Sequence, residues 1–464
     1  MSFHLREYQQ AGLDEIRRHL RAGVRSVLWQ MPTGAGKTAS TAHMLKGAAA
    51  KGNRAWFVVH RRELIMQSHK AFKAIGVEHG IIAAGFDLAM RRPVQICSVG
   101  TLARRLERVQ APHLIVWDEA HHMAAGTWQA IFRRFPRAAH IGLSATPERL
   151  DGHGLDGFFK AMVPGPSVRD LITDGFLVPY RLFAPAMGPD LSGVHKRAGD
   201  YARDELAAVM GKPKVVGDAV EHYRRVAMGR RAVVFAVSIE ASQRIVQAFR
   251  DAGIPAEHVD GETAPDERDA AIKRFAAGTT RVLSNVELFG EGFDLPAIEA
   301  VILLRPTQSL AMYLQQVGRG LRTAPGKADC IILDHAGNSA RHGLPDDDRE
   351  WTLAGHDAKQ RAASDPESSP IRQCPACFAI SPAAMLRCRE CGEPFPVQAR
   401  NVEHVEGELQ EVAIEEARRV AKREQAQAAT LDTLIELGRM RGYKAPEAWA
   451  RHVWNARANR RAAG

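Results

Sequence analysis

The stretch SVLWQMPTGAGKT, residues 26–38, constrains the fold of this chain more than any other feature. A short apolar run ends at Pro32, a loop with two glycines follows, and a helix-compatible sequence begins at Ala39. This order predicts a buried strand, a tight loop and a helix. Glycines let such a loop turn its N–H groups toward phosphate oxygens, and the helix N-terminus adds positive potential. The stretch therefore predicts a nucleoside triphosphate site.

Each residue type in this loop has a defined chemical use. Lys37 is expected to reach the terminal phosphates, and the Thr38 hydroxyl is expected to bind Mg²⁺. The common pattern G-x-x-x-x-G-K-[ST] has its first glycine where this chain has Met31, so Gly34 is expected to supply the flexibility. The loop residues expected to surround the phosphates are Thr33, Gly34, Ala35 and Gly36.

Strand-like runs recur between helical stretches and divide the chain into parts. They lie at 27–29, 55–59, 94–97, 114–117 and 141–143, and again at 232–236, 282–283, 300–304 and 331–333. This alternation predicts two α/β domains with parallel sheets, which suits a chain of 464 residues. We expect domains at 1–185 and 186–340, a linker at 341–370, a cysteine-rich module at 371–397 and a helical basic tail at 398–464.

Charge and hydropathy indicate the surroundings of the chain. No apolar run approaches the roughly 18 residues of a membrane span, and the N-terminus lacks an apolar leader. We therefore expect a cytoplasmic protein with no membrane association, and a monomer. The formal net charge of +10 suits a polyanionic partner, although charge alone does not identify one.

A second motif, LIVWDEAHH, begins at Leu114 and ends in acidic residues and histidines. An apolar strand that ends in two carboxylates suits Mg²⁺-dependent phosphate chemistry, with Asp118 holding the metal and Glu119 activating water. The alternative is an ordinary strand followed by a solvated turn. The phosphate loop lies about 80 residues upstream in the same predicted domain, which favours the catalytic interpretation.

Together the two motifs resemble the first half of a superfamily 2 helicase of the DEAH type. Further segments fit the motif series of that family in the correct order: Arg62-Glu63-Leu64 with Gln67, Ser144-Ala145-Thr146, Gly290-Glu291-Gly292-Phe293-Asp294, and Gln315 to Arg322, which fits Q-x-x-G-R-x-x-R. The resemblance implies two tandem RecA-like domains with an ATP cleft between them. The run from Val301 to Asn338 resembles RadD-type bacterial DNA-repair helicases, and related phage helicases.

The resemblance also implies roles for residues in both domains. Arg319 and Arg322, three residues apart on one helix face, would stabilise charge on the transferred phosphoryl group, with Gln315 in the same catalytic set. For an isolated R-x-x-R the alternative is a solvated helix face. Arg6 and Gln9 are implied at the adenine, and Gly292 and Asp294 at the nucleotide. The residues implied in coupling hydrolysis to motion are His121, Ser144 and Thr146.

Nucleic acid is expected to lie across both domains on the side away from ATP. Contacts to backbone phosphates would give affinity without sequence preference. A solubilising surface is the alternative for each arginine. The candidate residues are Arg61, Arg62, Thr101, Arg104, Ser238 and Thr263. We expect DNA as the partner, single-stranded or branched, with RNA as the alternative.

Four of the six cysteines form two C-x-x-C pairs separated by ten residues. This spacing predicts a closed, tetrahedral Zn²⁺ site of the zinc-ribbon type, with Cys374, Cys377, Cys388 and Cys391 as ligands. A redox dithiol or an iron–sulfur cluster are the alternatives. So short a module has too little core to fold without the metal, and it could bind DNA or a protein partner.

The C-terminal tail has two different parts. Residues 402–427 are charged and mixed, which predicts a long solvated helix. From Leu431 an apolar stripe of Leu434, Leu437 and Met440 precedes Trp449 and Trp454 among basic residues. A helical hairpin with buried tryptophans is favoured over a surface on which single-strand bases stack.

The sequence thus predicts an ATP-dependent nucleic-acid motor that uses ATP, Mg²⁺ and structural Zn²⁺, and that acts on DNA in repair, recombination or replication. One alternative is a translocase or RNA-directed motor that does not separate DNA strands. Another is a DNA-binding accessory protein with incidental ATPase activity. The intact set of Lys37, Glu119 and Arg319 argues against the accessory protein.

Overall fold

The computed structural model describes residues 4–87, 89–147, 154–184, 193–197, 200–210, 213–288, 298–354, 371–374, 376–382 and 385–395, with 189, 191 and parts of 424–454. The chain divides into two compact units, Met1–Phe395 and Pro396–Gly464, which are considered separately. Among the described residues, no helix has the length and apolar character that crossing a bilayer requires.

The first unit begins with a seven-stranded sheet in which all neighbouring strands are parallel. Its strand order is β3-β4-β2-β5-β6-β1-β7. The strands are β1 (Ser26–Gln30), β2 (Ala55–Val59), β3 (His79–Ile82), β4 (Val94–Ser98), β5 (Leu114–Trp117), β6 (Ala139–Ser144) and β7 (Ala161–Val163). Central strands such as β1 and β2 are buried at every position, because helices cover both faces of a parallel sheet.

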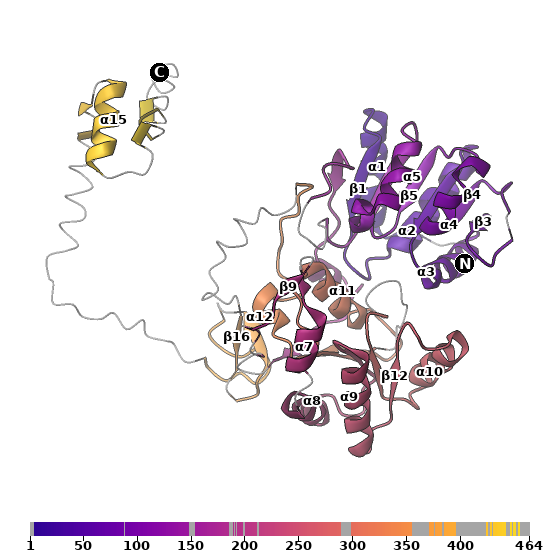
Figure 1. The fold of residues 1–464 in the computed structure, drawn as a ribbon, viewed down its shortest axis with the longest axis vertical. Helices are drawn as coiled ribbons and strands as arrows, with labels where there is room; N and C mark the ends of the chain where they lie inside the picture. Colours follow the sequence, from indigo (N-terminus) through magenta and orange to yellow (C-terminus); the bar gives the residue numbers. More distant parts are fainter. Residues whose placement is uncertain are drawn as a thin grey trace. The chain divides into compact units, whose positions relative to one another are not determined.

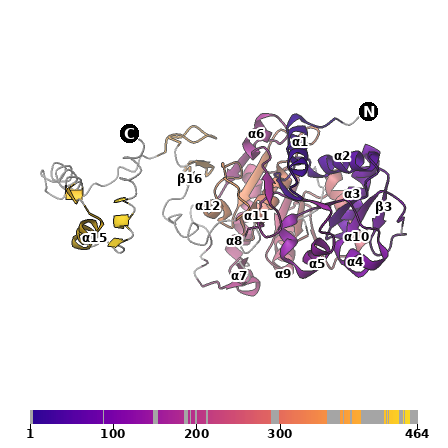
Figure 2. The ribbon, with the colours of Figure 1, turned by 90° about the horizontal axis from the view of Figure 1, so that it is seen from above.

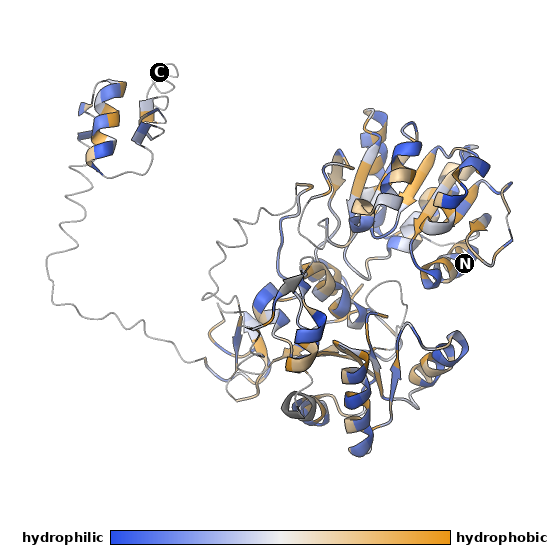
Figure 3. Ribbon diagram, in the orientation of Figure 1, coloured by the Kyte–Doolittle hydropathy of each residue, from blue (hydrophilic) through white to orange (hydrophobic). Residues whose placement is uncertain are grey.

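Helices alternate with these strands, as the sequence predicts (Figures 1 and 2). They are α1 (Glu7–Arg21), α2 (Lys37–Ala50), α3 (Arg62–Ile75), α4 (Val99–Arg104), α5 (Gly126–Arg134) and α6 (Val168–Thr173). Short 3₁₀ turns lie at Leu106–Arg108 and Ala120–Ala124. The strands are mostly apolar and the helices are hydrophilic on part of their surface (Figure 3), which is the amphipathic pattern of helices that pack on a sheet.

A second parallel sheet follows, with six strands in the order β12-β13-β11-β14-β15-β8. Its strands are β8 (Tyr180–Phe183), β11 (Ala232–Phe235), β12 (Ala256–Val259), β13 (Val282–Asn285), β14 (Ala300–Leu303) and β15 (Cys330–Asp334). Strand β8 pairs with β15 from Tyr180 to Phe183. The boundary predicted at residue 185 is therefore one strand too late, because the second sheet recruits its edge strand from the chain before the boundary.

The second sheet has its own set of helices. They are α7 (Arg203–Met210), α8 (Pro213–Val226), α9 (Ile239–Asp251), α10 (Pro265–Ala277), α11 (Leu310–Gly320) and α12 (Asn338–His342), and a short ribbon is formed by β9 (Lys196–Arg197) and β10 (Asp200–Tyr201). The two tandem parallel sheets confirm the predicted RecA-like fold class.

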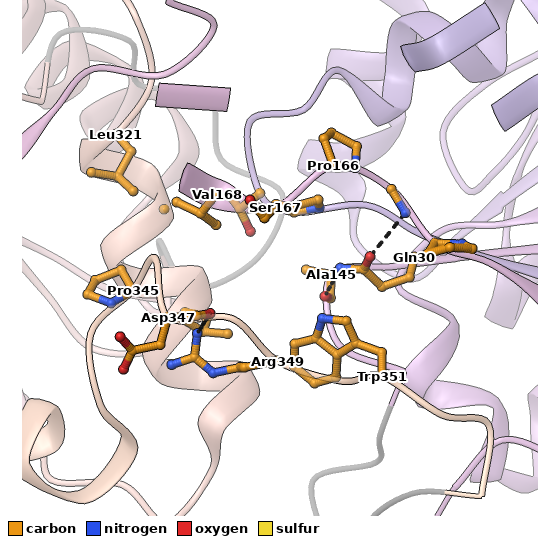
Figure 4. A pocket seen from close by; sticks show the side chains of 16 residues that line it. Gln30, Ala145, Pro166, Ser167, Val168, Leu321, Pro345, Asp347, Arg349 and Trp351 are labelled. Atoms are coloured by element: carbon orange, nitrogen blue, oxygen red, sulfur yellow. Dashed lines mark hydrogen bonds between the residues drawn. The ribbon is translucent and has the colours of Figure 1, made fainter. Parts of the chain in front are cut away.

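The chain after α12 corrects the predicted linker at 341–370. Residues 343–349 stay on the second domain, where the Tyr313 hydroxyl donates to the Gly343 carbonyl oxygen at 3.1 Å. The chain then reaches the first domain, where the Leu353 carbonyl oxygen accepts hydrogen bonds from the backbone N–H groups of Leu155 at 2.7 Å and Asp156 at 3.0 Å. Figure 4 shows Trp351 from this segment in a pocket with Gln30 and Ala145 of the first domain. The polar composition suggested a free linker, but contacts such as those of Trp351 and Leu353 fix the segment. Residues 355–370 lie outside the described residues.

The cysteine-rich module packs on the second sheet. Strands β16 (Ile371–Gln373) and β17 (Ile380–Pro382) pair in antiparallel fashion. Ala379 forms a bridge with Phe183 of β8, and Phe395 joins a buried cluster that contains Tyr223. The module is therefore a small ribbon that shares its apolar core with the second domain.

The second unit contains α15 (Leu431–Met440), which begins at the Thr430 cap. Leu434 and Leu437 are buried, as the apolar stripe predicts, but Met440 is 81% exposed because the stripe ends before the helix does. A side chain at Gly438 would lie 3.1 Å from the Trp449 ring, so this tryptophan packs closely on the helix. Trp454 is 39% exposed. The long helix predicted at 402–427 lies largely outside the described residues.

Candidate nucleotide cleft and metal centre

The main candidate site lies at the carboxyl ends of neighbouring strands of the first sheet. The phosphate loop follows β1, Ser144 ends β6, and Asp118 follows β5, and these three strands are adjacent. Ligands of open α/β sheets bind at this edge, because loops and helix N-termini converge there. Sequence spacing alone could not show the adjacency, which depends on strand order.

The phosphate loop uses both of its glycines. Gly34 and Gly36 have φ angles of +89° and +83°, a backbone region that side chains rarely adopt. A Cβ on Gly36 would lie 2.4 Å from Nε2 of Gln9, and that Nε2 donates to the Ala35 carbonyl oxygen at 3.0 Å. The Lys37 ammonium donates to the Met31 carbonyl oxygen at 3.3 Å. Gln9 is thus a direct support of the loop.

Two aromatic residues, Tyr8 and Phe176, lie beside the phosphate loop at the predicted adenine end of the site. The Arg6 guanidinium lies over the Phe176 ring, 4.2 Å from its centroid, and donates to the Tyr8 hydroxyl at 2.8 Å. The Tyr8 hydroxyl donates in turn to the Ala35 carbonyl oxygen at 2.8 Å. Tyr8 and Phe176 are not among the predicted site residues. Phe176 lies in no motif, although Tyr8 lies between Arg6 and Gln9 and an aromatic residue there was a usable signal.

The acid pair is almost fully buried, with Asp118 and Glu119 each 7% exposed. Burial, and after it the charge of Glu119, raise the pKa of Asp118 to about 6, although the nearby Lys37 charge opposes both. Glu119 has a φ of +49°, and its carboxylate lies 3.4 Å from Nδ1 of His121. A divalent cation would relieve the repulsion between the two carboxylates, which fits a Mg²⁺ site at Asp118.

The segment Ser144–Thr146 lies at the end of β6, next to the strand β1 that carries the phosphate loop. The Ser144 hydroxyl donates to the Thr146 carbonyl oxygen at 2.5 Å. Gln30 Nε2 donates to the Ala145 carbonyl oxygen at 3.0 Å. The segment is therefore tied to β1, the strand that carries the phosphate loop.

Helix α11 of the second sheet completes the cleft. Gln315 Nε2 donates to the Glu119 carboxylate at 3.4 Å, across the two domains. A Cβ on Gly318 would lie only 2.6 Å from Cβ of Thr33, so glycine permits the close approach of the helix to the loop. Arg319 is 5% exposed. The cleft is lined by Arg6, Thr33, Gly34, Gly36, Lys37, Thr38, Asp118, Glu119, Arg319 and Arg322.

The structure thus brings together residues that are about 280 positions apart in the sequence. One group comes from the first sheet and carries the loop and the acid pair. The other comes from the end of α11 and carries guanidinium groups. Arg319 lies on the helix, but Arg322 follows its end and forms a bridge with Leu177, so the two arginines do not share one helix face as predicted. Gly292 and Asp294 lie outside the described residues.

The six nucleic-acid candidates follow the carboxyl ends of strands in both sheets. Most have partners within the protein. The Arg61 guanidinium donates to the Glu287 carbonyl oxygen at 3.1 Å, and Arg62 lies over the Phe86 ring at 5.6 Å. Ser238 caps α9, Thr101 is buried in α4, and the Thr263 hydroxyl donates to Asp260 at 2.8 Å. Arg104 is exposed.

The four clustered cysteines form a compact sulfur group. The Sγ atoms of Cys374 and Cys391 lie 3.6 Å apart, as do those of Cys377 and Cys388, and all four lie within 4.8 Å of one another. A tetrahedral Zn²⁺ with Zn–S bonds of about 2.3 Å places its ligands roughly 3.8 Å apart. The group therefore fits a Zn²⁺ site of the ribbon type.

Comparison with known proteins matches both halves of the chain. Residues 2–149 match the family model described as type III restriction enzyme, res subunit. Residues 212–324 match the model described as helicase conserved C-terminal domain. The two matches cover the domains that supply the two sides of the cleft.

Individual relatives extend over most of the chain. It is 35% identical to the 51.5 kDa protein of a Lactococcus phage, with 82% of this chain and 81% of that protein covered. It is 30% identical to the putative ATP-dependent helicase IRC3 of Saccharomyces cerevisiae over 72% of this chain, but spans only about half (52%) of that protein. The solved structure of the ATP-dependent type ISP restriction-modification enzyme LlaBIII bound to DNA shares the fold, with a TM-score of 0.56 and 17% identity over 72% of this chain and 28% of that one.

Proposed function

This chain belongs to the superfamily 2 helicases, which are ATP-dependent helicases and translocases of nucleic acid, and we propose that its own substrate is DNA. The observation that carries the proposal is the cleft itself, where Lys37 and Glu119 of one sheet face Arg319 of the other. Such a cleft is complete only when both domains are close. ATP binding and hydrolysis can therefore drive domain movement.

We assign roles within the cleft from these positions. Lys37 contacts the terminal phosphates, and Thr38 and Asp118 would hold Mg²⁺, which neutralises charge on the phosphates when bound. Glu119 accepts a proton from the attacking water, and Gln315 holds its carboxylate in place. Arg319 and Arg322 stabilise the charge of the transferred phosphoryl group. Arg6 and Gln9 serve the adenine end.

Residues that do not contact the reacting phosphates are assigned roles in the same way, from their positions. His121 borders Glu119, and Ser144 and Thr146 connect β6 to the loop strand, so movement at the phosphates reaches the sheet through them. Arg61, Arg62 and Arg104 are positioned to meet backbone phosphates of nucleic acid. We further propose that Gly292 and Asp294 contact the nucleotide.

The choice of DNA is supported by the fold shared with a restriction-modification enzyme that is bound to DNA in its structure. It is also supported by the basic net charge of +10. The resemblance of residues 301–338 to RadD-type proteins supports a role in DNA repair, recombination or replication. An RNA substrate, or translocation without strand separation, is the competing proposal.

One experiment separates a DNA substrate from an RNA substrate and also tests the cleft assignment. ATP turnover is measured with single-stranded DNA, duplex DNA, forked DNA and RNA of matched length, in the wild type and in the Lys37→Ala variant. We expect DNA to stimulate turnover more than RNA, and no turnover in the variant. Equal turnover in the variant would contradict the cleft assignment, whereas greater stimulation by RNA would contradict the choice of DNA.

A further inference from the structure

The N-terminus of α3 contacts the second domain at two points. The Arg61 guanidinium donates to the carbonyl oxygen of Glu287, which follows β13, at 3.1 Å. Two residues later, the Glu63 carboxylate accepts a hydrogen bond from Nη1 of Arg268, on α10, at 2.8 Å. One short segment of the first domain is therefore connected to two separate segments of the second.

The Glu63–Arg268 pair differs from an ordinary surface ion pair in its burial. The Arg268 side chain is only 13% exposed, and that of Glu63 is 33% exposed. Exposed pairs contribute little because solvent and salt screen them, whereas partly buried pairs are screened less. Breaking this pair would leave a largely buried guanidinium without its carboxylate.

Arg268 is also anchored within its own domain. Its Nη2 donates to the Thr263 carbonyl oxygen at 3.2 Å. The turn that ends at Thr263 is itself fixed, because the Asp260 carboxylate accepts the backbone N–H groups of Glu262 at 3.0 Å and Thr263 at 2.8 Å. His258 donates to the other Asp260 oxygen, with the nitrogen and oxygen 3.0 Å apart. The guanidinium thus joins α3 to a rigid turn.

We propose that Glu63 and Arg268 form an interdomain latch, which couples nucleic-acid binding at the start of α3 to closure of the ATP cleft. The inference rests on the proposed function. Both residues are positioning residues, because neither lines the cleft. The pair forms only when the two domains are close. A strand that binds Arg62, next to Glu63, holds the carboxylate in place and so favours the closed state.

The coupling is reciprocal, as linkage requires. Nucleic acid that favours closure increases the fraction of molecules in which Arg319 faces the phosphate loop. Closure in turn holds the Arg61–Glu63 segment next to the Thr263 turn, because Arg268 bonds to both. The latch therefore links affinity for nucleic acid to ATP turnover without direct contact with either reacting group.

A charge-swap cycle tests the latch. The variants are Glu63→Gln, Arg268→Gln, the double glutamine variant, and the swap of Glu63→Arg with Arg268→Glu. ATP turnover is measured against single-stranded DNA concentration and also without DNA. We expect each single variant to raise the half-stimulating DNA concentration about fivefold, the double variant to match the singles, and the swap to recover most of the loss.

A matched control lies on the same helix. Arg274 on α10 pairs with Glu257 of its own domain, with Nη2 and Oε2 2.5 Å apart. Arg274→Gln removes an ion pair from α10 without changing the contact between domains, so less than a twofold effect is expected. Thermal melting of every variant shows whether a loss comes from unfolding, and the swap variant retains both charges.

The outcomes separate the latch from the proposed function. Additive single effects, or a swap no better than the singles, would overturn the latch in a wild type that DNA stimulates. Absence of stimulation by any nucleic acid would overturn the proposed function instead. In that case the same variants are compared by their ATP turnover without DNA. Additive effects of the Glu63 and Arg268 substitutions on this turnover would also overturn the latch.

Discussion

The nucleotide cleft and the cysteine cluster are two ligand sites built in opposite ways. The cleft combines the loop at Lys37 with Arg319, about 280 residues later, and its parts belong to two different sheets. The cluster draws all four ligands from Cys374–Cys391, within one small ribbon. In the cleft the fold exists first and the ligand brings its halves together. In the cluster the ligand stabilises the local fold.

The difference predicts how each site responds to damage. A change on one side of the cleft leaves the other side intact, so binding and hydrolysis can be separated. A change at any one cysteine opens the whole coordination sphere, because a closed Zn²⁺ site needs four ligands.

The largest expected effect is the separation of binding from hydrolysis by Arg319→Ala. The variant removes charge that arrives from the second domain, while Lys37 and the loop remain. Turnover should fall by about 10³-fold or more, as for other arginine fingers. The affinity for ATP, measured with a fluorescent analogue, should change less than about fivefold.

Arg133→Ala is the matched control, because Arg133 lies on the exposed side of α5 outside the cleft. It should leave both quantities unchanged. Parallel loss of ATP binding and turnover in Arg319→Ala would contradict the division of the cleft between two domains.

The same division explains what the sequence could predict. All nine predicted strand runs lie in strands of the two sheets, because buried parallel strands are continuous apolar runs. The four parallel strands that the prediction missed are β3, β7, β8 and β12, and each is an edge of its sheet. Edge strands are partly solvated and carry polar residues, as Glu257 and His258 do in β12. Edge strands therefore lack the continuous apolar run that identified the central strands.

Site residues show a similar limit. Motifs identified the charged groups that line the cleft, because their types and spacing are restricted. They did not identify Phe176, which lies beside Arg6 only through tertiary packing, or the pairing of Glu63 with Arg268. The polar segment 343–354 looked like a linker because many of its contacts are hydrogen bonds and ion pairs, such as Arg169 with Asp348, and composition does not distinguish paired polar residues from solvated ones.

The second prediction concerns the metal. Cys388→Ser should abolish the one bound Zn²⁺ expected per chain by elemental analysis, and should expose the ribbon to limited proteolysis. ATP turnover should change less than about threefold, because the cleft lies on other elements. The ribbon shares a buried cluster with Tyr223, so part of its packing on the second domain should survive.

Cys97→Ser provides the control, since Cys97 is equally buried but stands alone in β4 of the first sheet. It should retain full Zn²⁺ content. A Cys388→Ser protein that keeps its metal would show that the cluster is not the binding site.

The smallest expected effect is a difference in pH dependence between the two regions. His335 follows β15 beneath the ribbon, stacked on the His222 ring at 5.1 Å. Burial, with a smaller contribution from the neighbouring His222, lowers the pKa of His335 to about 3. The pKa of Asp118 is raised instead. As pH falls, the two groups should therefore change the free energy of unfolding in opposite directions.

The sign for His335 follows from proton binding. Below its unfolded pKa of about 6.5 the unfolded chain binds a proton that the folded chain excludes, so stability falls as pH falls. Between pH 6.5 and pH 5 this histidine should cost about 2 kcal/mol of unfolding free energy. His335→Gln should remove that part of the acid loss in urea unfolding curves at pH 8, 6.5 and 5. If the unfolding free energies of wild type and variant changed equally with pH, the pKa of His335 would be normal in the folded protein. The expected difference in pH dependence between this region and the cleft would then be absent.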